Sequence, residues 1–310
     1  MISRFLPEGR RIGTPENQAA CASRAALLTA RDRGMILEGR ALLCEAGHDL
    51  LVQVGPFTGR IPRDETAIGV AEGTTREIAI LSRVGKPVCF TVETVEGPDS
   101  DLTLTLSRRK AQEIAQAALL SELKPGMVIP ATVTHLEPFG AFVDIGCGLV
   151  SMIGIEHISI SRIPHPSCRF TVAQEIFAAV LDTDPAQNRV RLTHRELLGT
   201  WAENAAGLTT GMTVAGTVRG IKDYGAFIEL TPNLSGLAEP RPDLKEGDRV
   251  SVYLKAILPE RMKIKLLVID RLPAEAAPGP LRYYITAGRL AHWRYAPEAC
   301  EKAGIETDFL

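Results

Sequence analysis

The stretch Pro138-Phe139-Gly140-Ala141-Phe142 recurs later in the chain as Asp223-Tyr224-Gly225-Ala226-Phe227. Each copy holds two aromatic residues three positions apart around a Gly-Ala pair, although the whole chain has only two Trp, five Tyr and nine Phe. The small residues leave the backbone uncluttered, so a planar base can approach the aromatic rings. A base stacked on an aromatic side chain contributes roughly 1 to 3 kcal/mol, whatever its identity. The repeated stretch therefore predicts platforms for nucleic-acid bases.

The repeat extends beyond the aromatic residues. At the same offset, Gly126-Met127 aligns with Gly211-Met212, Val133 with Val218, and Asp144 with Glu229. After a change of offset, Arg189-Val190-Arg191-Leu192 aligns with Lys263-Ile264-Lys265-Leu266. Two copies of one domain are indicated, and the second copy is shorter, with the loss expected in loops.

The pattern around these copies is that of short strands. Leu50, Val52 and Val54 alternate with other residues, and the runs 88–92 and 102–106 also favour strands. Gly and Pro between such runs are typical of turns, so we expect small barrels or sandwiches. Helices are predicted at 14–33, at 107–123, and from a capping box at Thr193-His194-Arg195-Glu196 to Gly207.

Composition limits the classes of function. The formal net charge is -2, so binding to RNA has to come from local patches and stacking. Neither a membrane-length apolar run nor a signal-peptide pattern is visible, which predicts a cytoplasmic protein without membrane partners. The six cysteines are scattered singly, so neither a metal site nor a disulfide framework is expected.

The sequence contains no nucleophile elbow, phosphate-binding loop or metalloprotease motif. We therefore expect no catalytic residues, no cofactor and no enzymatic activity. The dispersed carboxylates are interpreted as solubilising groups.

Several motifs of the central copy together resemble one known family. They are Gly126, Val133, the run 139–146, the run 154–159, Asp184 and the run 189–193, all in the right order. This set is similar to the S1-type RNA-binding domain. The resemblance implies a five-stranded antiparallel OB barrel, a fold that binds single strands on an exposed sheet surface.

The segment 35–107 resembles the same domain more weakly. On that alignment His48 replaces Phe139, Leu51 replaces Phe142, and Pro62 replaces His157. We infer a barrel that kept its core and lost most of its stacking face. The predicted organisation is a helical lead-in (1–34), a degenerate barrel (35–107), a linker helix (108–123), an RNA-binding barrel (124–193), a linker helix (194–208), a shortened barrel (209–270), and a linker with an aromatic tail (271–310).

The resemblance also implies the residues of the RNA face. In the central copy they are Phe139, Phe142, His157, Asp184, Arg189 and Arg191, and in the third copy Tyr224, Phe227, Lys222 and Lys263. For the aromatics, the alternative is that one of them fills the barrel. For His157, the alternatives are a capping residue or a core histidine, and Arg162 and Arg169 are expected on a solvated face.

The third copy departs from the family pattern. Glu239 replaces the histidine and Leu258 replaces the aspartate. A carboxylate repels phosphate, so weaker binding is expected here unless Arg219, Lys222 and Lys265 compensate. The sequence thus favours the central barrel as the main RNA site.

The function that the resemblance implies is binding of single-stranded RNA, mRNA included, in translation. The expected partners are RNA and the small ribosomal subunit, and the protein is expected to be a monomer. The alternative is an adaptor that docks on the ribosome or on an RNA-processing enzyme through the lead-in, the first barrel and the tail. The five tail aromatics either stack on RNA or dock on the third barrel, and docking is favoured.

Overall fold

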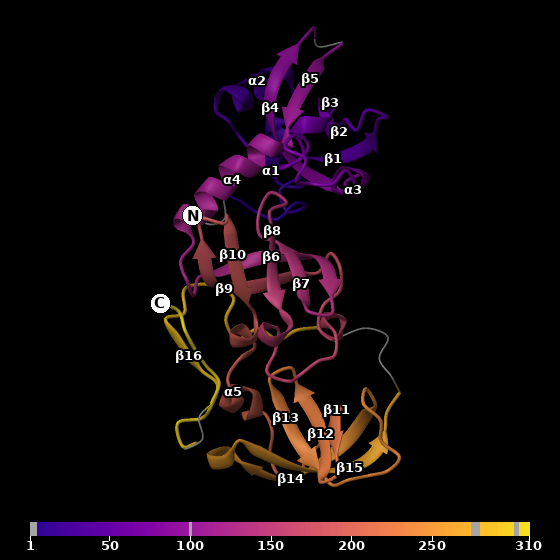
Figure 1. The fold of residues 1–310 in the computed structure, drawn as a ribbon, viewed down its shortest axis with the longest axis vertical. Helices are drawn as coiled ribbons and strands as arrows, with labels where there is room; N and C mark the ends of the chain where they lie inside the picture. The colour runs from indigo at the N-terminus through magenta and orange to yellow at the C-terminus, as the bar shows by residue number, and fades with distance from the viewer. Residues whose placement is uncertain (1–4, 99–100, 274–279, 301–303) are drawn as a thin grey trace. The chain divides into compact units, whose positions relative to one another are not determined.

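Three closed β-barrels follow one another along the chain (Figure 1). The computed structural model describes residues 5–98, 101–273, 280–300 and 304–310. Each barrel has five strands, and short helices join the barrels, which confirms the predicted all-β class. Part of the predicted linker at 271–280 lies outside the described residues.

The strands of each barrel are as follows. The first barrel contains β1 (Leu37–Cys44), β2 (Leu50–Val54), β3 (Phe57–Ile61), β4 (Pro87–Glu96) and β5 (Thr103–Ser107). The central barrel contains β6 (Val128–Glu137), β7 (Gly140–Asp144), β8 (Val150–Gly154), β9 (Glu175–Asp184) and β10 (Arg189–Thr193). The third barrel contains β11 (Thr213–Lys222), β12 (Gly225–Thr231), β13 (Leu234–Ala238), β14 (Arg249–Leu258) and β15 (Lys263–Arg271).

One strand pairing in each barrel is parallel. β3 pairs with β5, β8 with β10, and β13 with β15 in this way. The other pairings of the first and third barrels are antiparallel. In each barrel this parallel pairing joins the two strands that would otherwise be free edges, so the sheet closes and leaves no edge unpaired.

Alternation of buried and exposed side chains explains the strands. On β2, Leu50, Val52 and Val54 are fully buried, whereas Gln53 is exposed. Successive side chains of a strand point to opposite faces, so this pattern directs one face into the barrel. The alternation in the sequence therefore predicts correctly which residues of β2 face the barrel interior.

Some helices precede or join the barrels, and others lie in the loops between two strands of one barrel. They are α1 (Pro15–Ala20), α2 (Arg24–Asp32), η2 (Arg63–Glu65), α3 (Ile78–Leu81), α4 (Arg108–Glu122), η3 (Ile155–His157), η4 (Pro166–Cys168), η5 (Arg195–Leu198), α5 (Trp201–Ala205) and η6 (Pro259–Arg261). The expected N-cap at Thr14 is present, since its Oγ1 accepts the N–H of Asn17 at 3.3 Å. The shortness of the third copy arises between strands three and four, where residues 239–248 replace the 155–174 connection of the central barrel.

The predicted helix at 194–208 is broken. Thr193 is the last residue of β10, and the short helix η5 ends at Gly199, whose φ is 84°. A new cap then begins α5, where Thr200 Oγ1 accepts the N–H of Glu203 and Glu203 bonds back to the N–H of Thr200. The capping box therefore lies at Thr200 rather than at Thr193, about two helical turns later than the sequence predicted, because Gly199 with its positive φ interrupts the helix.

The chain forms two compact units. Unit one holds residues 1–122, 130–132 and 144–150, and unit two holds residues 123–129, 133–143 and 151–310. In unit one, the buried Glu8 carboxylate accepts two hydrogen bonds from the Arg108 guanidinium, at 2.7 and 2.9 Å. This ion pair fixes the N-terminal segment against the start of α4.

In unit two, the described residues of the C-terminal tail (280–300 and 304–310) run beside the central and third barrels, drawn in yellow in Figure 1. The short strands β16 (His292–Arg294) and β17 (Glu306–Asp308) pair with each other. Trp293, Tyr295 and Phe309 are buried in the core that surrounds the third barrel. Tyr295 contacts the third barrel, where its hydroxyl donates to the Asn233 carbonyl, as the docking hypothesis predicts. Phe309 lies beside Gly126 at the start of the central barrel, and Tyr283 also contacts this barrel through His194.

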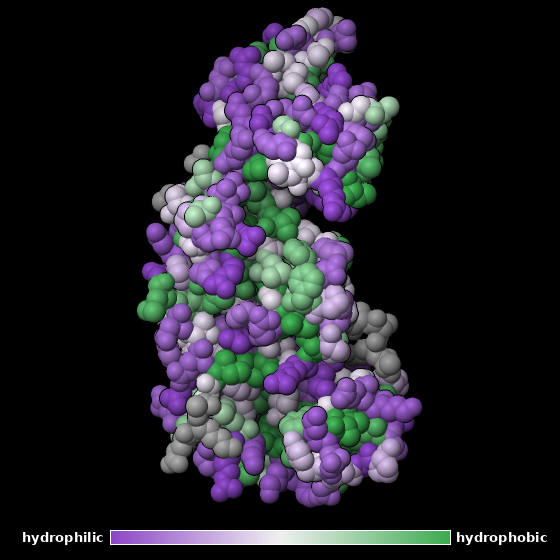
Figure 2. Space-filling model, in the orientation of Figure 1, coloured by the Kyte–Doolittle hydropathy of each residue, from purple (hydrophilic) through white to green (hydrophobic). Residues whose placement is uncertain are grey.

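None of the described helices is long and apolar enough to cross a membrane. On the face shown in Figure 2, hydrophobic residues form separate patches among hydrophilic ones. On this face the apolar surface is thus divided into local patches and does not form one broad area.

Candidate nucleic-acid interface

The two aromatic pairs have the same geometry. Phe139 and Phe142 meet edge to face, with ring centroids 6.0 Å apart and an interplanar angle of 89°. Tyr224 and Phe227 do the same at 6.1 Å and 85°. Edge-to-face contact is a preferred arrangement of aromatic rings, and it leaves ring faces open to a third planar group.

These rings point to solvent. Phe139 is 56% exposed and Tyr224 is 65% exposed, while Phe227 is 37% exposed and Phe142 is partly exposed. The first aromatic of each pair precedes a strand, and the second lies on β7 or β12 with its side chain on the outer face. Neither ring of either pair fills a barrel.

The other residues predicted for the central face have different environments. His157 is partly buried, and this burial, with the nearby Arg195 charge, lowers its pKa below the ordinary value, so the ring is neutral at pH 7. The Asp184 carboxylate accepts the N–H groups of Ala186 and Gln187 at 3.0 and 3.2 Å, which makes it part of a turn.

The two arginines of β10 also differ. The Arg191 guanidinium bonds the Asp182 carboxylate, so its charge is neutralised locally. Arg189 is exposed, and no ion pair joins it to any residue that the structure describes. Arg189 is therefore the cation of β10 that remains available to a phosphate.

The third barrel keeps available two of the cations that the sequence analysis named, whereas Arg219 is bonded to Glu229. Lys222 and Lys263 are exposed, and within the described parts of the chain no ion pair involves them. The Glu239 carboxylate bonds Lys255 at 2.9 Å, so its repulsion of phosphate is partly cancelled. The sequence analysis ranked the third barrel below the central one because Glu239 should repel phosphate. The pairing of Glu239 with Lys255 weakens that argument.

A groove follows the third barrel from the aromatic pair to its cations. It has a volume of about 540 Å³ and is bordered by Tyr224 and Phe227 on one side. The basic residues along it are Lys255, Arg261, Lys263 and Lys265. An aromatic platform beside a basic groove is the arrangement that binds single strands without base preference.

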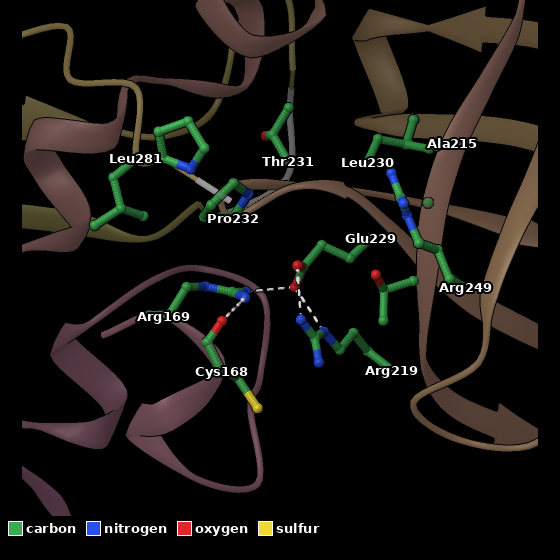
Figure 3. A pocket seen from close by; sticks show the side chains of 13 residues that line it. Cys168, Arg169, Ala215, Arg219, Glu229, Leu230, Thr231, Pro232, Arg249 and Leu281 are labelled. Atoms are coloured by element: carbon green, nitrogen blue, oxygen red, sulfur yellow. Dashed lines mark hydrogen bonds and ion pairs between the residues drawn. The ribbon is translucent and has the colours of Figure 1, made fainter. Parts of the chain in front are cut away.

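Arg169 is not on a solvated face, as the sequence suggested, but is buried. Its guanidinium bonds the Glu229 carboxylate from one side, while Arg219 bonds the same carboxylate at 3.0 and 3.1 Å from the other (Figure 3). Glu229 belongs to β12 and Arg169 to the central barrel, so the triad joins two barrels of unit two. Two guanidinium groups share one carboxylate, which leaves one net positive charge at this junction.

The structure adds one residue to the central pair that the sequence analysis missed. The His135 ring lies 6.2 Å from the Phe142 ring, tilted by 32°, and its Nε2 is 2.7 Å from the Glu137 carboxylate. The repeat alignment could have identified His135, because it pairs His135 with Gly220 of β11. Gly220 follows a bulge and lies opposite Phe227.

That matching position differs in every barrel. Strand pairing places Gly220 opposite Phe227 in the third barrel and Leu43 opposite Leu51 in the first. His135 holds this position in the central barrel, according to the repeat alignment. The residue beside the second stacking position is therefore leucine in the first barrel, histidine in the central barrel and glycine in the third.

The first barrel exposes aliphatic residues instead of aromatic ones. Leu42, Leu43, Ile78, Leu81 and Val84 are each more than 40% exposed. His48 and Leu51 stand at the positions that the stacking aromatics hold in the other barrels, as the alignment indicated. This difference separates the first barrel from the other two in chemistry, though not in fold.

Closed five-stranded barrels, two of which carry an exposed aromatic pair, define OB-type modules, a fold class that binds single strands on its outer surface. Residues 122–195 match the model of the S1 RNA binding domain. These residues, which include the central barrel, are thus an S1 RNA-binding domain.

Its curated relatives are ribosomal proteins. The chain is 32% identical to small ribosomal subunit protein bS1 of Leuconostoc lactis over 242 residues, which cover 72% of this chain and 54% of that protein. It is 31% identical to bS1 of Streptococcus pneumoniae, over 55% of this chain and 47% of that protein. It is 32% identical to the bS1 homolog of Bacillus subtilis, over 54% of this chain and 48% of that protein. The chain spans about half the length of the curated relatives it matches.

Proposed function

We propose that this protein binds single-stranded RNA through the aromatic pairs of its central and third barrels, without enzymatic activity. The observation that carries this proposal is the identical edge-to-face geometry of two exposed aromatic pairs. Bases stack on such rings, and the nearby Arg189, Lys222 and Lys263 attract phosphates.

The setting we propose is translation in the cytoplasm. The support for this setting is the similarity to small ribosomal subunit proteins. In this proposal the protein is a monomer that presents mRNA near the small subunit. His157, Asp184 and Arg191 complete the proposed central face: His157 is partly buried, Asp184 holds a turn, and Arg191 is exposed but shares its charge with Asp182.

Binding titrations with an RNA single strand and with the duplex of the same length test this function. The single strand should bind at least about tenfold more tightly, because paired bases cannot leave their stack to meet the aromatic rings. Equal affinity for the two would contradict the proposal. Degradation of the RNA by the pure protein would contradict the absence of enzymatic activity.

A second candidate is favoured by the exposed aliphatic residues of the first barrel. In this case the protein is an adaptor, and Leu43, Ile78 and Leu81 contact a partner protein on the ribosome or on an RNA-processing enzyme. Co-sedimentation with protein partners should then persist after nuclease treatment. Loss of all partners on nuclease treatment would leave RNA binding as the sole function.

A further inference from the structure

A second cavity in unit two adjoins the Tyr224 and Phe227 pair. Its volume is about 640 Å³, within the range of roughly 300 to 1,000 Å³ typical of small-molecule sites. Its walls come from three parts of the chain: the loop 160–162 of the central barrel, the third barrel, and the residues Trp201 and Tyr295. We call this cavity the inter-barrel pocket.

The position of its walls is fixed by hydrogen bonds. The Ile160 N–H donates to Asn233 Oδ1 at 2.9 Å, and the Ser161 N–H donates to the Pro232 carbonyl at 3.0 Å. Behind them, the Trp201 N–H donates to the Tyr295 carbonyl at 3.0 Å. The pocket is therefore a built feature of unit two.

Gly220 keeps this pocket open. It lies on β11 opposite Phe227, and a Cβ added there would approach no atom closer than 3.9 Å. The first barrel has Leu43 at the matching register, and the central barrel has His135 beside Phe142. Of the three barrels, the third has free space next to its second stacking ring because this residue has no side chain.

The chemistry of the walls suits one nucleotide. Arg162 and Lys222 line the pocket, and among the described residues no carboxylate pairs with either. Arg219 lines it as well, although Glu229 shares its charge. Glu246 is the acidic residue on the lining. The balance favours a phosphate at the basic part of the wall.

Two hydroxyl groups offer base recognition. Ser161 Oγ and Ser235 Oγ are 2.8 Å apart, and both residues line the pocket. One hydroxyl hydrogen is used between them, so the other hydrogen and the remaining lone pairs can meet a base edge. Stacking alone tolerates any base. Each hydroxyl can donate or accept, so the selection comes from position: a base is favoured when its edge places a polar atom within reach of these two hydroxyls.

We propose that the inter-barrel pocket binds the nucleotide next to the one stacked on Tyr224 and Phe227 and selects its base. This inference rests on the proposed function and adds sequence preference to it. The phosphate meets Arg162 and Lys222, and the base enters the space beside Gly220 to reach Ser161 and Ser235.

The test compares homopolymer oligonucleotides of A, U, C and G in binding titrations with three proteins. The wild-type chain should prefer one homopolymer by a factor of about 5 to 100, the discrimination expected of polar contacts to a base. Gly220→Leu, which copies the residue of the first barrel, should reduce this preference to less than about twofold while retaining binding through stacking. Gly207→Leu is the matched control, because a Cβ at Gly207 meets nothing within 4 Å and the residue lies outside the pocket.

A second variant tests the pocket independently, in case Gly220→Leu does not fold. Ser161→Ala with Ser235→Ala removes the hydroxyls without filling the pocket, and it should abolish the preference with little loss of overall affinity. A wild-type protein that binds RNA but ranks all four homopolymers equally overturns the pocket and leaves the proposed function standing. A preference unchanged in both variants does the same, whereas absence of RNA binding by the wild type overturns the proposed function.

Discussion

His194 shows how a single buried side chain ties the tail to the central barrel. Its Nδ1 lies 2.8 Å from the Ile158 carbonyl and its Nε2 lies 2.9 Å from the Tyr283 hydroxyl. Nδ1 donates to the carbonyl and Nε2 accepts from the hydroxyl, which is possible for neutral imidazole alone. Burial accordingly lowers the pKa of His194 to about 4, from an ordinary value near 6.5.

This depressed pKa predicts a loss of stability in acid. The unfolded chain takes up the proton more readily, so stability present above about pH 6.5 is lost as the pH falls toward 4. The loss should reach about 3 kcal/mol in the free energy of unfolding. Urea unfolding of the wild type and of His194→Gln across this pH range checks it, because the stability difference between the two should shrink in acid. A constant difference would contradict the assignment.

At the same scale, the sequence predicted the exposed aromatics but not the buried Arg169. A repeat of Phe-Gly-Ala-Phe carries its own local signal, whereas Arg169 depends on Glu229, which lies in another barrel. Likewise, the significance of Gly220 appears only when strand pairing places it opposite Phe227. Contacts between distant segments leave no periodic signal in the sequence.

Among the elements, the turn between β12 and β13 has an unusual role in unit two. Asn233 is fully buried there, and its side-chain N–H groups donate to the carbonyls of Arg195 and Gly199 at 2.7 and 2.8 Å. Its Oδ1 also accepts the N–H of Ile160, as described for the pocket. One side chain thus satisfies three backbone groups from outside its own barrel.

Asn233→Ala should therefore destabilise unit two strongly. Each buried backbone group left without a partner costs about 1 to 3 kcal/mol, so the total should be roughly 3 kcal/mol or more. Denaturant unfolding measures it, with Gln187→Ala in an exposed turn as the control, for which a change below about 0.5 kcal/mol is expected. A small effect of Asn233→Ala would show that water replaces the amide.

Element type was largely predictable, and element ends were less so. The strands follow from alternation of buried residues, and α4 follows from its apolar face. The helix expected at 194–208 was wrong in its continuity, because Gly199 adopts a positive φ that the capping pattern does not reveal. Packing of the tail on two barrels required contacts that no local pattern encodes.

For the whole molecule, a net charge of -2 limits the electrostatic part of RNA binding. The cations that we place along the RNA are few, with Arg162, Arg189, Lys222 and Lys263 the main ones. For about three to five phosphate contacts on a single strand, the logarithm of the binding constant should fall against the logarithm of salt concentration with a slope of about -2 to -3.5. Titrations over a range of salt check this. A much steeper slope would indicate a basic surface beyond these residues.

The most direct test of the central claim removes each aromatic pair in turn. Phe139→Ala with Phe142→Ala, and Tyr224→Ala with Phe227→Ala, are compared with the wild type in titrations with a single-stranded RNA. The exposed Tyr253→Ala, on the third barrel outside the pair and both cavities, is the control. Each double variant should raise Kd by about five- to thirtyfold, because one stacked base contributes roughly 1 to 2 kcal/mol, while the control should change it less than about twofold. Unchanged affinity in both double variants would contradict the assignment of the aromatic pairs to RNA.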